Sequence, residues 1–86
     1  MGTNLLGPYY EGAFRAAIAS YFFNGKISER LIDLAKETIS RFREYEIEHA
    51  LIDPAQKEEL KRQWKQWLEA TTQGIKDEFR AQGKLE

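Results

Sequence analysis

The distribution of charge along the chain is the feature that most constrains its fold. The first 25 residues carry only two charged side chains, Glu11 and Arg15, whereas the other 61 carry twelve positive and thirteen negative ones. The same first segment holds six of the eleven aromatic residues, which are Tyr9, Tyr10, Phe14, Tyr21, Phe22 and Phe23. An aromatic segment with so few charges needs a cover, which either the rest of the chain or a second molecule supplies.

The chain length indicates a single domain, which we place at residues 1–84 of the 86. A chain this short buries only roughly 60–65% of its unfolded surface, so association with a second copy would add stability. The last two residues, Leu85 and Glu86, resemble the join to a purification tag. We therefore expect residues 85–86 to be a cloning scar that takes no part in the fold.

Apolar residues recur at helical spacing, and no stretch alternates as a β-strand would. The sequence predicts an all-α domain with three helices, over about 8–23, 29–52 and 54–80. Because only one or two residues separate the second and third helices, we expect them to form a long antiparallel hairpin. The short apolar first helix then either fills the groove of that hairpin or dimerises, and we expect dimerisation to complete the domain.

Local signals set the expected helix ends. Asn24-Gly25 tolerates the left-handed conformation at the end of the first helix. Ser28 and Asp53 are good N-caps for the second and third helices. Two threonines followed closely by Gly74 weaken the third helix, and a kink or break there is one expectation.

Helical spacing also predicts which side chains face the core. In the second helix we expect a buried stripe that consists of Leu31, Leu34, Ala35, Ile39, Phe42, Tyr45 or Glu46, and His49. In the third helix the corresponding stripe consists of Leu60, Trp64, Trp67, Leu68, Thr71, Ile75 and Phe79. The charged residues then lie on the outer faces and keep the domain soluble.

The aromatic first helix is the best candidate for an interaction surface. Three consecutive aromatics, 21–23, point around most of a helix, and one core buries them all only with difficulty. A stripe of small residues, Gly12, Ala16 and Ser20, would let another helix approach closely. We expect a non-enzymatic protein–protein interaction or regulatory module, a homodimer first and a complex with another protein second. Its expected contact residues are Phe14, Ala17, Tyr21, Phe22 and Phe23.

A metal-binding helical protein is the alternative. Glu46 and His49 are three residues apart, which is the Glu-x-x-His arrangement that ferritin-like di-iron proteins project into a bundle core. Glu58 or Glu59 would lie opposite them if the hairpin closes tightly at Asp53, and Glu58 is the ligand that we expect. The expected ligand is iron or another divalent metal, and the only plausible enzymatic activity is one that depends on this metal. The simpler interpretation is a histidine at a helix end, stabilised by the helix dipole.

A nucleic-acid accessory protein is the second alternative. Four basic residues surround a tryptophan on the third helix, and they are Lys57, Lys61, Arg62 and Lys65. Glutamates interrupt this patch, and the net charge of −1 does not attract a polyanion from a distance. A solvated, salt-paired helix face is the simpler interpretation.

Two further features bear on catalysis and location. The chain has no cysteine, which excludes disulfides and thiol nucleophiles, and no phosphate-binding loop or serine nucleophile motif is present. The start lacks the pattern of a signal peptide, and the segment 5–23 is too polar for a membrane span. We therefore expect a cytoplasmic protein with no membrane partner.

Overall fold

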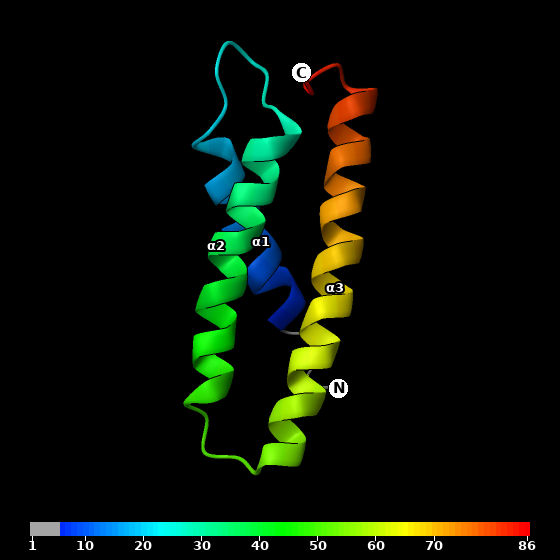
Figure 1. Cartoon of the computed structure of the whole chain (residues 1–86). Helices are drawn as coiled ribbons and strands as arrows, with labels where there is room; N and C mark the ends of the chain where they lie inside the picture. Colours follow the sequence, from blue (N-terminus) through cyan, green and yellow to red (C-terminus); the bar gives the residue numbers. More distant parts are fainter. Residues whose placement is uncertain (1–5) are drawn as a thin grey trace.

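Three α-helices form an elongated bundle in the computed structural model, which describes residues 6–86 and the side chains from residue 9 onward (Figure 1). The helices are α1 (Leu6–Ala19), α2 (Glu29–Glu48) and α3 (Pro54–Ala81). α2 and α3 lie side by side and antiparallel, and α1 packs on this pair. The bundle measures 46 × 22 × 16 Å, and its long axis follows α3. The predicted all-α fold with a hairpin of long helices is confirmed.

Both predicted N-caps are confirmed. The Ser28 hydroxyl accepts a hydrogen bond from the backbone N–H of Leu31 at 3.3 Å, and the Asp53 carboxylate accepts one from Gln56 at 2.8 Å. α3 continues without a break past Gly74. Packing explains this, because Phe79, beyond the glycine, is held in the core, and such burial outweighs a propensity cost of roughly 1 kcal/mol.

The first helix is shorter than the predicted range 8–23, because it ends at Ala19. The hydroxyl of Ser20 donates to the carbonyl of Ala17 at 2.6 Å and closes the last turn. Asn24 and Gly25 both have positive φ, 56° and 77°. They form a two-residue hairpin turn in which the backbones of Phe23 and Lys26 exchange hydrogen bonds of 2.8 and 3.1 Å. Asn24-Gly25 therefore reverses the chain after the helix instead of capping it.

The second helix also ends before its predicted limit at residue 52. Its last residue is Glu48, and the backbone N–H of His49 caps it by donating to the carbonyl of Tyr45 at 3.1 Å. Residues 49–53 form the connection to α3. Asp53 must adopt an extended conformation to cap α3, so the chain leaves the helix several residues earlier.

The core forms where the inner side of α1 enters the groove between α2 and α3. Tyr10, Phe14 and Ile18 lie four residues apart on this side, and all three are buried. The helices of the hairpin and the loop before it supply the rest of the core, which is Ile27, Ile32, Ala35, Ile39, Trp64, Leu68, Ile75 and Phe79. The α2 stripe predicted from the sequence is wrong in part, because Ile32 and Ile47 face inward while Leu34 and Phe42 are exposed.

Ion pairs on the outer side of the hairpin fix the register of α2 against α3. They join Asp33 to Lys76 at 2.9 Å, Lys36 to Glu69 at 2.9 Å, and Glu48 to Lys61 at 3.0 Å. Each pair is partly exposed and contributes little stability alone. Together they join oppositely charged side chains of α2 and α3 along much of the hairpin.

The C-terminal residues contact the fold, contrary to the expectation that 85–86 take no part in it. The backbone of Ile27 donates to the carbonyl of Lys84 and accepts from the N–H of Glu86, each at 2.9 Å. The side chain of Leu85 is half-buried and packs against the core. This segment lies beside the α1–α2 loop at one end of the bundle (Figure 1). Whether 85–86 are a cloning scar stays untested.

We expect Phe14→Ala to lower the free energy of unfolding by about 3–5 kcal/mol, because Phe14 has no exposed surface and its removal leaves a cavity in the core. Urea denaturation followed by circular dichroism measures the loss. The control is Phe23→Ala, since Phe23 is 74% exposed and its loss costs about 0.5 kcal/mol or less. Equal effects of the two substitutions would contradict the observed orientation of α1.

We expect Leu85→Ala to lower the free energy of unfolding by about 1–2 kcal/mol. The side chain is only half-buried, so its loss costs less than the roughly 2–5 kcal/mol of a fully buried leucine. The same denaturation assay applies. Glu86→Ala is the matched control, because Glu86 is exposed and holds Ile27 only through its backbone. A neutral Leu85→Ala would show that the tail is dispensable.

Candidate functional site

An apolar groove of about 240 Å³ runs between α1 and α2 on the outside of the bundle. Its walls are Tyr9, Tyr10, Ala13 and Ala17 from α1 and Thr38, Ile39 and Phe42 from α2. Tyr9 and Phe42 project at its edges, with 62% and 61% of their surface exposed. None of the described residues that line the groove is charged. A concave apolar surface with projecting aromatic edges is typical of a protein-binding site.

The outer side of α1 has no charge, which explains why this groove is apolar. From residue 9 onward, the exposed residues of the helix are Tyr9, Gly12, Ala13, Ala16 and Ala19. Both charges of α1 turn toward α3: the Arg15 guanidinium binds both carboxylate oxygens of Glu78, at 3.0 and 3.2 Å, and Glu11 at 3.1 Å.

The exposed side of α2 forms the second wall of the groove. Leu34, Thr38, Phe42 and Tyr45 recur at three- and four-residue steps and are all exposed. Helical spacing places them on one side of α2. Thr38 and Phe42 line the groove beside α1, whereas Tyr45 borders the charged groove toward α3. We call the surface made by these four residues, the exposed residues of α1 and the groove between them the α1–α2 face.

Tyr10 forms the floor of the groove and ties α1 to both other helices. Its hydroxyl donates a hydrogen bond to the carboxylate of Glu46, and the Arg43 guanidinium lies 5.3 Å from the centre of its ring. Trp64 packs edge-on against the same ring, with the two centres 5.2 Å apart. Burial, reinforced by the hydrogen bond to Glu46, raises the pKa of Tyr10 to about 12.

The residues predicted as the interaction surface occupy different environments. Phe14 is completely buried in its own chain, so it is not available to a partner. Phe22 packs against the core and meets Phe79 edge-on at 5.4 Å, and Tyr21 is also half-buried. Ala17 lines the groove, as expected of a contact residue. Phe23 is exposed in the hairpin turn, away from the residues of the α1–α2 face.

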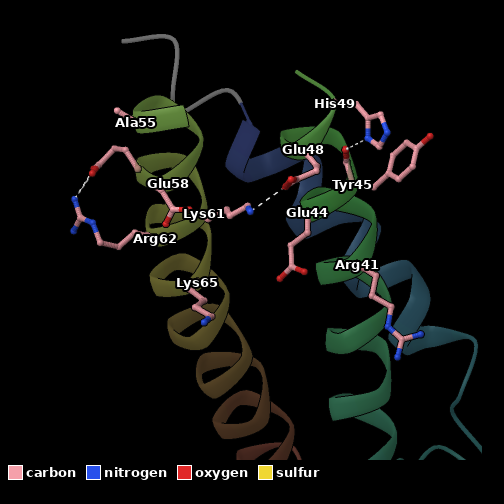
Figure 2. Close-up of a pocket in the computed structure, with 11 residues that line it drawn as sticks. Arg41, Glu44, Tyr45, Glu48, His49, Ala55, Glu58, Lys61, Arg62 and Lys65 are labelled. Carbon is pink, nitrogen blue, oxygen red and sulfur yellow. Dashed lines mark hydrogen bonds and ion pairs between the residues drawn. The ribbon is translucent and has the colours of Figure 1, made fainter. Parts of the chain in front are cut away.

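The predicted metal ligands do not come together. Glu46 binds Tyr10, whereas the ring of His49 stacks on Tyr45 and its Nδ1 lies 3.0 Å from the Tyr45 carbonyl oxygen. Figure 2 shows His49 and Tyr45 pointing away from α3, which carries Glu58. Within residues 6–86, no three histidine, cysteine, aspartate or glutamate side chains are grouped as metal ligands would be.

Three of the four predicted nucleic-acid residues, Lys61, Arg62 and Lys65, line a charged groove of about 850 Å³ between α2 and α3 (Figure 2). Two of the four form ion pairs with glutamates, and a third binds a backbone carbonyl. Lys61 reaches across to Glu48, Arg62 binds Glu59, and Lys57 donates to the carbonyl of Glu48 at 2.7 Å. These contacts lower the pKa of Glu48 and of Glu59 and raise that of Lys61 and of Arg62. Lys65 is exposed at the edge of the groove.

The sequence pattern contained signals for the α1–α2 face, but their assignment was wrong. The expected core stripe of the second helix includes Leu34, Phe42 and Tyr45 or Glu46, but all of these residues are exposed. Ala13 is absent from the expected contact residues, and Tyr9 enters the prediction only as one of the aromatics of the first segment. The usable signal was the presence of two apolar stripes on one helix, more than a single core contact requires.

Comparisons of the chain with protein-family models, with curated proteins and with solved structures give no match. None of the helices in the described part of the chain combines the length and the apolar character that crossing a bilayer requires. The function is therefore argued from the geometry of the site itself.

We expect the stability of the protein to fall between pH 10 and pH 12 through ionisation of Tyr10. The folded pKa of about 12 lies above the unfolded value of 10, so this contribution is complete below pH 10 and is lost as the pH rises through 12. Tyr10→Phe should lose less stability over this range than the wild type, by on the order of 2 kcal/mol.

Urea midpoints at pH 9 and pH 11.5 measure this difference. Tyr9→Phe is the matched control, because Tyr9 is the neighbouring tyrosine and its side chain is exposed. It should follow the wild type at both pH values. If Tyr10→Phe also follows the wild type, ionisation of Tyr10 is not coupled to unfolding.

Proposed function

We propose that this chain is a non-enzymatic interaction module that associates with a second copy of itself through the α1–α2 face. The observation that carries the proposal is the groove between α1 and α2, which has uncharged walls and two aromatic edges that are more than half exposed. Burial of this surface gains the hydrophobic free energy of its aromatic groups and removes no charge from water.

The proposed contact surface differs from the one inferred from the sequence. Phe14 and Phe22 serve the internal core, whereas Tyr9 and Phe42 are exposed and take their place. Ala17 belongs to both sets. The mechanism is the same, since apolar and aromatic area is buried between two molecules while charged outer faces keep the assembly soluble. A chain without cysteine is compatible with a reducing cytoplasm, where we expect the module to act.

We expect the wild-type chain to have a mass close to twice the 10.1 kDa of one chain, measured by light scattering on a sizing column at tens of micromolar. Phe42→Asp should restore the monomer mass, because it places an unpaired charge within the surface that the dimer would bury. Its helical circular dichroism should stay unchanged, since Phe42 is mostly exposed within one chain.

Leu51→Asp is the matched control for this experiment. Leu51 is a fully exposed apolar residue in the α2–α3 connection, outside the α1–α2 face, so its change to aspartate should leave the dimer intact. A wild-type monomer at these concentrations would refute the proposal. A Phe42→Asp variant that remains dimeric would place the interface on another surface.

A further inference from the structure

The centre of the outer side of α1 consists only of small residues. Tyr9 lies near one end of this side, and Gly12, Ala13 and Ala16 follow as exposed positions toward Ala19. Helices with such residues at their contact approach to an interaxial distance near 8 Å, the short end of the usual range. The small residues carry no inference alone. They matter because the apolar groove and its aromatic edges lie directly beside them.

The α1–α2 face of one molecule carries both a projecting aromatic side chain and a depression lined by small side chains. Tyr9 projects at one end of the groove, and the opposite end is lined by Ala17 and Thr38, which are smaller side chains. A two-fold interface requires a self-complementary patch of this kind, because each copy must present both halves of the contact. Antiparallel α1 helices bring Tyr9 of each copy toward the Ala17 end of the other. This arrangement also opposes the helix dipoles favourably.

The available area is sufficient for a modest dimer. Tyr9 and Phe42 are each more than 60% exposed and line the groove, so each contributes roughly 100–150 Å². Together with the small residues of α1 they supply on the order of 400 Å² per copy, which is the size of a weak interface rather than the about 800 Å² of a standard specific one. Such an area is compatible with association in the micromolar range.

We infer that two copies associate about a two-fold axis that passes between Ala13 and Ala16, with their α1 helices antiparallel and in direct contact. This inference rests on the proposed function, to which it adds the arrangement of the partner. An axis at this position is the one that overlaps the two uncharged sides along their whole length, from Tyr9 to Ser20. A displaced axis would leave one end of each apolar side in water.

Single-cysteine cross-linking tests the arrangement, because the natural chain has no cysteine to interfere. With helix axes about 8 Å apart, the antiparallel pair brings the two Ala16 Cα atoms to roughly 6 Å, within the range of a disulfide. The two Ala19 Cα atoms are then more than about 13 Å apart, which is too far. In a parallel pair equivalent residues stay at the same height, so the two Ala19 Cα atoms come to about 7–9 Å, nearer than in the antiparallel pair and close to the limit of a disulfide.

The experiment compares Ala16→Cys, Ala19→Cys and Ala70→Cys under mild oxidation, by non-reducing electrophoresis. Ala70 is exposed on α3 and reports random collision. We expect Ala16→Cys to form the disulfide dimer at least about tenfold faster than the other two. The masses of the reduced variants, measured by light scattering, show whether each substitution preserves association.

The outcomes separate the inference from the function on which it rests. Rapid cross-linking of Ala16→Cys alone supports the antiparallel arrangement. Equal cross-linking of Ala19→Cys indicates parallel helices and overturns the inference. A reduced dimer in which neither position cross-links faster than Ala70→Cys also overturns it, while the proposed self-association stands. A monomeric wild-type chain refutes both.

Discussion

Burial of the inner side of α1 in the α2–α3 groove is the interaction on which the rest of the structure depends. Tyr10, Phe14 and Ile18 fill a space that the two long helices leave between them, and neither long helix has another layer to cover its apolar side. The hydroxyl of Tyr10 enters this space only because Glu46 accepts its hydrogen bond. A single short helix thus supplies the centre of the core and fixes the side of the hairpin on which α1 lies.

This arrangement also determines the character of the outer surface. α1 has only two charged residues, Glu11 and Arg15, which pair with each other, and Arg15 also binds Glu78 of α3. The outer side of α1 is therefore left with small and aromatic residues. α2 contributes an exposed apolar stripe beside it. The opposite side of the hairpin shows the reverse, with ion pairs between α2 and α3 along much of its length. One side of the bundle is therefore apolar, and the other carries paired charges.

The sequence predicts the elements of this fold better than their orientation. In α3 the charged residues leave a single apolar side, so Trp64, Leu68 and Ile75 are assigned correctly. In α2 two apolar stripes compete, and spacing alone cannot tell that Ile32 faces inward while Phe42 faces outward. That choice depends on where α1 docks, which is a tertiary property. Asn24-Gly25 is ambiguous for a similar reason, since the same dipeptide suits a helix end and a hairpin turn.

The pairing of Ile27 with the C-terminal segment has a consequence for the order in which the chain folds. The α2–α3 hairpin is built from contacts that are local in sequence, and such contacts form early. Ile27 and Leu85 are separated by the whole hairpin, so their contact requires closure of a long loop. The backbone pairing of Ile27 can therefore form only after the last residues of the helical hairpin have folded back on the α1–α2 loop. The domain therefore acquires its full stability only after translation has passed its last helix.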